Sequence, residues 1–124
     1  MSEAEHQKAV VGYCDLKGIP CFHIPNGGYR NKREAAHLKS QGVKPGVPDL
    51  CIPVAKGGYH GLWVEMKDVK GRPTKSQLGW IKRLRGNGYA AYVCRGSANA
   101  IALIDLYMSE TLDPPQEDAT RPAS

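Results

Sequence analysis

The chain has 124 residues, which is enough for one hydrophobic core and too few for a second one. Apolar residues make up 41% of it, but no apolar run approaches the roughly 18 residues that cross a membrane, so we expect no membrane span. Residues 1–5 lack the basic and apolar regions of a signal peptide, and we therefore expect an intracellular, cytoplasmic protein.

The formal net charge is +5, but the charges are unevenly distributed along the chain. Residues 110–124 carry a net charge of −3, which leaves +8 on residues 1–109. A small domain this basic favours a polyanionic partner, although a solvated basic surface gives the same count. Because residues 110–124 are also proline-rich and lack aromatic side chains, we expect one domain over residues 1–109 and a disordered tail after it.

The cysteines give no sign of a metal site. They form no C-x-x-C pair, and together with the four histidines they show no recognised zinc spacing. Each lies in or beside an apolar run, where a free cysteine packs as a small apolar side chain. We therefore expect four reduced, structural cysteines: Cys14, Cys21, Cys51 and Cys94.

Helical and extended patterns alternate along the first half of the chain. Side chains recur at helical spacing from Glu3 onward, and Gly18 with Pro20 ends that helix. Two prolines and two glycines in residues 42–48 exclude a regular element there, so this segment is a stiff loop. The elements expected before and directly after the loop are a helix over 3–17, a strand over 21–24, a short helix around 34–40 and a strand over 50–54.

Turn and helix-capping residues indicate where the elements in the second half of the chain begin and end. Gly57 and Gly58 predict a hairpin turn. Thr74 and Gln77 form a capping box at the start of a helix, and Ser97 is expected to cap the last helix. The order α-β-(α)-β-β-α-β-α predicts an α/β (α+β) fold, in which helices cover both faces of a mixed sheet. The elements expected here are a strand over 61–67, a helix to about residue 86, a strand over 89–94 and a helix to about residue 108.

The strand over 61–67 brings chemically active side chains together. Strand alternation puts Glu65 and Lys67 on one face, about 6.6 Å apart along the strand. Asp49 stands at the start of the preceding strand. If the two strands form an antiparallel hairpin centred between Gly57 and Gly58, Asp49 lies against residues 65–67. Two carboxylates and one amine then converge.

Such a cluster suits phosphodiester hydrolysis. Carboxylates on rigid strands form a hard-oxygen site for Mg²⁺, and a neighbouring lysine orients water or stabilises charge that develops on phosphorus. The alternative is an exposed ion-pair cluster, because Glu-x-Lys is a common pattern on strands. Pro48 fixes the approach to Asp49, which a merely solvated ion pair would not require.

These residues and their neighbours resemble the PD-(D/E)xK nuclease superfamily. More narrowly they are similar to the VRR-NUC group, whose small stand-alone members occur largely in phages. The resemblance implies a restriction-endonuclease-like core, Mg²⁺- or Mn²⁺-dependent DNA cleavage and, for stand-alone members, homodimers that act on branched DNA. It runs from about residue 3 to residue 108 and includes residues 26–28, 44–49, 60–67 and 71–77 in the family's order.

By position, the resemblance assigns metal binding to Asp49 and Glu65, with the Met66 carbonyl as an extra ligand. Lys67 would position or activate the attacking water. Gln77 would lie near the site at the start of its helix, or would serve only as the capping-box partner of the residue three positions before it.

The family also has an acidic residue on its first helix. Glu3 is favoured here, because it shares the inward face of the helix with Gln7 and Val10, whereas Glu5 points elsewhere. Gln7 is the alternative, and it would make the metal site less negative. An acid in a first helical turn also has an ordinary explanation in the helix dipole.

Basic residues flank the proposed site and are the expected contacts to DNA phosphates. Asn26 either joins these contacts or forms an Asx-turn, while Tyr29 and Tyr59 either stack on unpaired bases or pack. Nothing here reads a base sequence, so we expect selectivity for DNA structure. The basic residues are Arg30, Lys32, Arg33, Lys39 and Lys44 before Asp49, and Lys70, Arg72 and Lys75 after the strand.

The sequence therefore predicts a Mg²⁺- or Mn²⁺-dependent endodeoxyribonuclease. It would hydrolyse phosphodiester bonds in branched or nicked DNA, including four-way Holliday junctions, and would work as a homodimer in the cytoplasm, that of a host cell if it is phage-encoded. Two alternatives stay open. One is a catalytically inactive DNA-binding domain of the same fold, and the other is a basic protein-interaction module.

Overall fold

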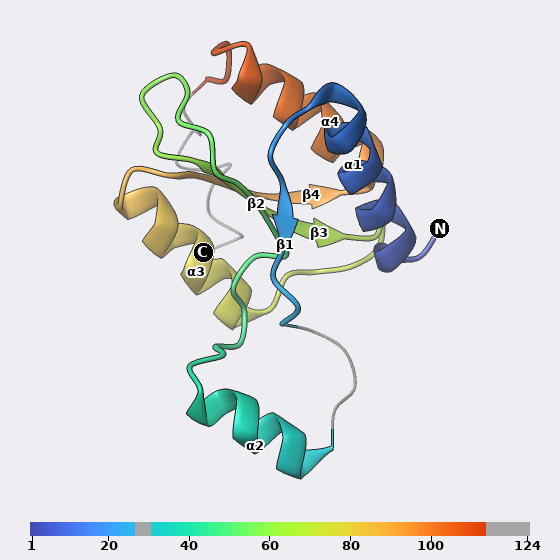
Figure 1. The fold of residues 1–124 in the computed structure, drawn as a ribbon, viewed down its shortest axis with the longest axis vertical. Helices are drawn as coiled ribbons and strands as arrows, with labels where there is room; N and C mark the ends of the chain where they lie inside the picture. Colours follow the sequence, from blue (N-terminus) through green and yellow to red (C-terminus); the bar gives the residue numbers. More distant parts are fainter. Residues whose placement is uncertain (27–30, 114–124) are drawn as a thin grey trace.

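A four-stranded mixed sheet in the order β1-β2-β3-β4 organises the computed structural model, which describes residues 1–26 and 31–113. β1 pairs antiparallel with β2, β2 antiparallel with β3, and β3 parallel with β4. Helices α1 and α4 cover one face, and α3 packs on the other (Figure 1). This mixed sheet between helices confirms the predicted fold class. The bounds are α1 Glu3–Lys17, β1 Phe22–His23, α2 Lys32–Ser40, β2 Leu50–Ile52, β3 Leu62–Lys67, α3 Lys75–Gly86, β4 Ala90–Arg95 and α4 Ser97–Met108.

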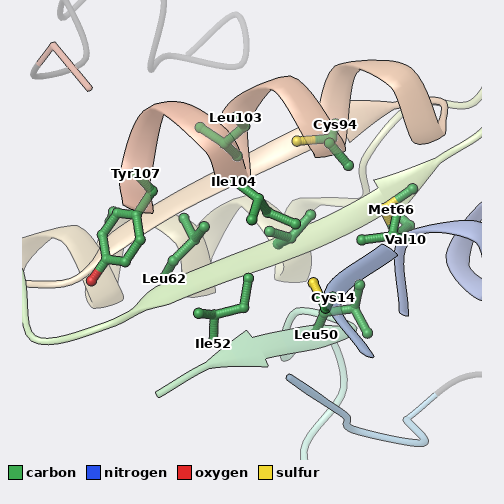
Figure 2. Packing of buried hydrophobic residues seen from close by; sticks show 13 residues of the cluster. Val10, Cys14, Leu50, Ile52, Leu62, Met66, Cys94, Leu103, Ile104 and Tyr107 are labelled. Carbon is green, nitrogen blue, oxygen red and sulfur yellow. The ribbon is translucent and has the colours of Figure 1, made fainter. Parts of the chain in front are cut away.

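The hydrophobic core lies between the sheet and the pair α1 and α4 (Figure 2). Alternation along β3 gives this face Leu62, Val64 and Met66, all of them fully buried. Burying each such side chain contributes about 1.5–3 kcal/mol relative to exposure. The other face of β3 is thereby left to the polar residues of the predicted site. The helices supply Val10, Cys14, Ala100, Leu103, Ile104 and Tyr107 to the core.

All four cysteines are free thiols, as predicted. Cys14, Cys51 and Cys94 are buried, and Cys21 is half-buried. Burial raises the pKa of the Cys94 thiol to about 12, because a thiolate is poorly solvated among apolar groups. These cysteines therefore belong to the packing of the domain rather than to its chemistry.

The β2–β3 hairpin turns at the predicted glycines, but its strands pair one residue away from the register that a centre between Gly57 and Gly58 gives. Lys56 and Tyr59 form a bridge around Gly57 and Gly58, whose φ angles of 57° and 89° suit glycine in a tight turn. Within the strands, Leu50 pairs with Val64. Continued by one residue, this register sets Asp49 opposite Glu65, inside the predicted range of residues 65–67.

The ends of β1, β3 and β4 differ from the predictions by one residue at most, and three further differences have a physical reason. β2 ends at Ile52 rather than at residue 54, because Pro53 has no N–H to give to a partner strand. α2 begins at Lys32, where the Asn31 side chain accepts a bond from Glu34 N–H at 2.8 Å. Ser97 is not the N-cap of α4: the cap is Gly96, which adopts φ 84°, and the Ser97 side chain lies against His6 instead.

Within the described ranges, α2 lies outside the compact core, whereas Leu112 after α4 packs against it. α2 projects away from the sheet (Figure 1), and none of its nine residues, all of them described, is buried. After α4, the Glu110 side chain accepts a bond from Gly57 N–H at 3.0 Å. The predicted tail beyond residue 113 lies outside the described residues. Across the described ranges, no helix is long and apolar enough to cross a membrane.

Candidate active site

Three carboxylates meet at the carboxyl end of β3. They belong to Glu3 in the first turn of α1, Asp49 directly before β2, and Glu65 in β3, and one oxygen of each lies within 4.8 Å of the others. The antiparallel pairing brings the start of β2 beside the end of β3, and α1 packs against β3. Residues far apart in sequence thus form one acidic group. Among the described residues, this is the group that could hold a metal ion.

Glu65 is the buried member of the group, with a side chain that is 2% exposed. Its Oε2 accepts a bond from Gln77 Nε2 at 3.1 Å, while its Oε1 has no hydrogen-bond partner within the described ranges. Burial, followed by the charge of Asp49, raises the pKa of Glu65 to about 9. A carboxylate in this position needs either a proton or a cation beside it.

Asp49 is held by a backbone N–H group. Its Oδ2 accepts a bond from Met66 N–H at 2.8 Å, which ties the residue before β2 to the end of β3. Pro48, directly before it, is fully buried and restricts the approach of the chain. The bond from Met66 N–H and the buried Pro48 therefore hold the Asp49 carboxylate beside Glu65.

Lys67 supplies the positive charge of the site. Its Nζ lies 3.8 Å from Glu65 Oε2 and 4.0 Å from Glu3 Oε2, and its side chain is 11% exposed. Burial raises the pKa of Glu3, an effect that Lys67 opposes and Asp49 reinforces. One ammonium group thus faces three carboxylates, so the site retains an excess of negative charge when all of them are ionised.

Gln77 forms the predicted capping box and also lies beside the acidic group. Its Oε1 accepts a bond from Thr74 N–H at 2.7 Å, and its backbone N–H donates to Thr74 Oγ1 at 3.2 Å, which completes the capping box. Its Nε2 donates to Glu65 Oε2. The start of α3 therefore fixes the side chain of the buried carboxylate.

The loop before Asp49 packs against the first turns of α3, a contact that the sequence analysis missed. Gly46 has a φ of 88°, and a Cβ there would lie 2.6 Å from the backbone carbonyl carbon of Ser76. Trp80 Nε1 donates to the Pro45 carbonyl at 3.1 Å. In the sequence, the glycine between two prolines indicates a tight loop. It does not indicate the partner of that loop, because α3 begins 29 residues later.

The structure distinguishes the two acidic candidates on the first helix. Glu3 lies in the acidic group. Glu5 is exposed and forms a capping box with Ser2, accepting a bond from Ser2 N–H at 3.0 Å. Gln7 is half-buried and lies one turn further along α1 than Glu3. The position of Glu3 on the inward face of the helix thus correctly indicated that it lies near the other two carboxylates.

Of the predicted DNA contacts, Arg30 lies outside the described residues, as does Tyr29. The Asn26 side chain donates to the Lys44 carbonyl, a bond that neither of its two interpretations included. The Tyr59 ring packs against Tyr107, with 6.2 Å between ring centroids. The remaining predicted contacts are exposed side chains on α2, on the loop after it and between β3 and the start of α3: Lys32, Arg33, Lys39, Lys44, Lys70, Arg72 and Lys75.

The chain is similar in sequence and in fold to proteins of one known family. The sequence profile of the VRR-NUC domain family matches residues 2–98. A solved structure described as a VRR_NUC domain protein is similar to the chain with a TM-score of 0.76 and 34% sequence identity, over 89% of this chain and 90% of that one. None of the curated proteins gives a significant match.

Proposed function

Because the chain belongs to the VRR-NUC family, we propose that it is a Mg²⁺- or Mn²⁺-dependent endonuclease that cleaves branched DNA. Membership in this family implies a nuclease-type function, a DNA substrate and a divalent metal ion. The observation that carries the proposal is the group of three carboxylates within 4.8 Å of one another, with the Lys67 ammonium 3.8 Å from one of them.

The residues present fit a small divalent cation. The donors are all oxygen, which Mg²⁺ and Mn²⁺ prefer, and the unpartnered Oε1 of Glu65 is a buried acceptor in need of a positive charge. Asp49 and Glu65 would hold the ion, with Glu3 beside them and the Met66 carbonyl as a further ligand. When bound, such an ion activates water and neutralises negative charge on a phosphate.

The protein's own groups supply the remaining functions. Lys67 would orient the attacking water and offset charge on the phosphate, because its ammonium is held against the carboxylates and largely shielded from solvent. Gln77 would keep Glu65 in one rotamer through the bond to Oε2. No side-chain nucleophile is required for this hydrolysis.

DNA structure, rather than base sequence, is the proposed basis of selectivity. Exposed lysine and arginine side chains lie on α2 and around the start of α3. We propose that they bind phosphates on either side of the acidic group. Such contacts carry no sequence information. Recognition would then depend on how a branch places its strands, and we propose that a homodimer presents two such sites to a symmetrical junction.

The direct test is cleavage of labelled duplex, flap, splayed-arm and four-way-junction DNA with Mg²⁺, Mn²⁺ or EDTA. We expect metal-dependent cleavage of the branched substrates. Asp49→Ala and Lys67→Ala should each remove cleavage and leave DNA binding in place, because the first removes a ligand and the second the ammonium. Lys82→Ala, an exposed lysine on α3, is the matched control and should cleave normally.

Cleavage that persists in both site variants, or in EDTA, would show that the active site is elsewhere. DNA binding without cleavage by the wild-type chain under all metal conditions would favour the inactive DNA-binding domain. Binding to an acidic protein with no measurable DNA binding would favour the interaction module.

A further inference from the structure

His6 occupies a position between α1 and α4 that the proposed chemistry does not use. It lies one turn after Glu3 on α1, and its ring is half-buried. The Nδ1 atom accepts a bond from Ser97 N–H at 2.9 Å, and the Ser97 hydroxyl oxygen lies 3.2 Å from the same atom. A side chain near the start of the chain thus binds the start of the last helix, 91 residues away.

The first turn of α4 needs this acceptor. The N-cap is Gly96, which carries no side chain to accept a bond from the first N–H groups of the helix. An aspartate or serine could supply one, but the φ of 84° at this position favours glycine. His6 provides the acceptor from another helix. Because a backbone N–H only donates, Nδ1 carries no proton and the neutral ring holds its proton on Nε2.

The same corner is attached to the active site. Gly96 N–H donates to the Lys67 carbonyl at 2.9 Å, so the residue before Ser97 is fixed to the residue that carries the ammonium group. At the α1 end of this connection, His6 and Glu3 are three residues apart and therefore lie one turn apart on the same side of the helix. A chain of two hydrogen bonds therefore connects the turn that holds Glu3 with the backbone of Lys67.

Glu3 depends on such a connection more than the other two acids do. Its side chain is 44% exposed, and it lies in the first turn of a helix, where fraying begins. The capping box of Ser2 and Glu5 fixes where α1 starts but does not attach that turn to the sheet. Repulsion from Asp49 also opposes the close approach of an ionised Glu3.

We propose that His6 is a positioning residue, which holds Glu3 beside Lys67 and the other two carboxylates by anchoring α1 to the start of α4. This inference rests on the proposed function, in which Glu3 lies next to the bound metal ion. It assigns no contact between His6 and substrate. Residues that orient metal-binding groups typically change metal affinity or activity by about 10- to 100-fold when removed.

The first experiment needs neither metal nor DNA. In the metal-free protein, ¹⁵N NMR of the histidine rings should show His6 as the tautomer with its proton on Nε2 and an unprotonated, hydrogen-bonded Nδ1. The His6→Asn variant should preserve the bond, because Asn Oδ1 takes the place of Nδ1 as an acceptor. A His6 ring protonated on Nδ1 would overturn the inference.

The second experiment measures Mn²⁺ affinity by calorimetry and cleavage kinetics. His6→Ala should weaken Mn²⁺ binding and lower kcat by about 10-fold each, with KM for DNA unchanged, whereas His6→Asn should stay within about threefold of wild type. Asn99→Ala is the matched control, since it removes the Asn99 bond to the Arg95 carbonyl at the same helix start without touching α1. Equal losses in the Ala variants of His6 and Asn99 would indicate a structural role only.

A double-mutant cycle separates this inference from the proposed function. If His6 acts through Glu3, adding His6→Ala to Glu3→Gln should weaken Mn²⁺ binding no further. An additional 10-fold loss in the double variant, or unchanged binding in His6→Ala alone, would overturn the positioning role and leave the metal site standing. A wild-type chain that binds no Mn²⁺ would instead overturn the proposed function, while thermal unfolding would identify any variant that fails to fold.

Discussion

Glu65 combines features that a protein core avoids unless they serve a purpose. Its carboxylate is buried, one of its oxygens has no hydrogen-bond partner within the described ranges, and Asp49 lies beside it. Burial and that neighbouring charge raise its pKa to about 9, so near neutral pH the metal-free site keeps a proton on Glu65. A divalent ion would replace this proton, which couples metal binding to proton release.

The raised pKa predicts how stability depends on pH without metal. The folded state holds the Glu65 proton more tightly than the unfolded chain does, so the stabilisation is complete below the unfolded value of 4.5 and is lost as the pH rises through about 9. In EDTA, the free energy of unfolding should therefore fall between about pH 5 and about pH 9, as measured by urea denaturation. The Glu65→Gln variant cannot ionise and should show a flatter profile.

Two controls test whether the pH dependence of the free energy of unfolding comes from Glu65. Glu34→Gln, an exposed glutamate on α2, should keep the wild-type profile. Saturating Mg²⁺ should abolish this decline in the wild-type protein, because the ionised carboxylate then has a cation beside it and the folded state no longer holds a proton that the unfolded chain has lost. If the profiles of wild type and Glu65→Gln run parallel, the Glu65 carboxyl is not held in the protonated form that its surroundings favour.

At the scale of elements, the loop before β2 connects Asp49 of the acidic group with α3. A methyl group at Gly46 would meet the backbone of Ser76 and Gln77 at 2.6–2.8 Å, and the φ of 88° is unfavourable for any side chain. We expect Gly46→Ala to destabilise the protein by at least about 1–3 kcal/mol and to displace Asp49, with loss of cleavage. Denaturant unfolding and cleavage assays of the purified variant measure both effects.

Gly42→Ala is the control for backbone strain alone. Gly42 also has a positive φ, 102°, but a Cβ there would meet nothing within 4 Å. This variant should lose stability by about 1–2 kcal/mol and still cleave DNA. Equal cleavage in the Ala variants of Gly42 and Gly46 would argue that the loop does not position Asp49.

The projecting helix α2 offers a second prediction at this scale. Its basic side chains are exposed, and a hollow of about 530 Å³ lies between it and the segments that flank it, lined in part by Ile24, Leu38 and Val47. Reversing Lys32 and Arg33 to Glu should weaken DNA binding and flatten its salt dependence, with Mn²⁺ affinity unchanged. Binding titrations over a range of salt concentrations would measure this effect.

Its control keeps the change in net charge and moves it elsewhere. Lys8→Glu with Lys82→Glu alters two exposed lysines on α1 and α3. If this pair weakens DNA binding as much as the α2 pair does, overall charge rather than α2 determines the affinity.

Local sequence determines which features could be predicted. The Asp49–Glu65 contact follows from a hairpin, whose centre is visible as Gly57-Gly58 and whose strands are adjacent in the chain. The alternation of β3 likewise separates its core face from its site face without knowledge of other elements. The capping box of α3 is equally local. Each of these features depends on residues within one turn, strand or hairpin.

Contacts between distant elements could not be predicted in the same way. Ser97 has the chemistry of an N-cap, but the conformation of Gly96 and the acceptor on His6 place the cap elsewhere. Gly46 could be recognised as a turn residue, whereas its contact with Ser76 depends on how α3 packs. The missed residues are thus those whose partners lie on another element.

At the scale of the whole molecule, charge separates the basic body of the chain from its acidic centre. Residues 1–109 carry +8, yet three carboxylates are gathered at one end of β3. A basic surface attracts DNA by releasing its counterions, while an acidic site repels a phosphate unless a cation is bound between them. In the proposed function, this arrangement would make productive phosphate binding depend on the metal ion, while DNA binding elsewhere on the surface would not depend on it.

In the proposed function a single acidic site would cut one strand, and the proposed homodimer makes a further prediction. On a supercoiled plasmid that extrudes a cruciform, one nick relaxes the DNA and removes the junction, so a linear product requires both cuts within one bound complex. Wild-type dimers should give linear DNA, whereas mixed dimers with Asp49→Ala should give nicked circles. Excess Asp49→Ala protein should therefore shift the products from linear to nicked in proportion to mixed dimers. A monomer in sedimentation with and without DNA, together with an unchanged product ratio in these mixtures, would contradict the paired arrangement.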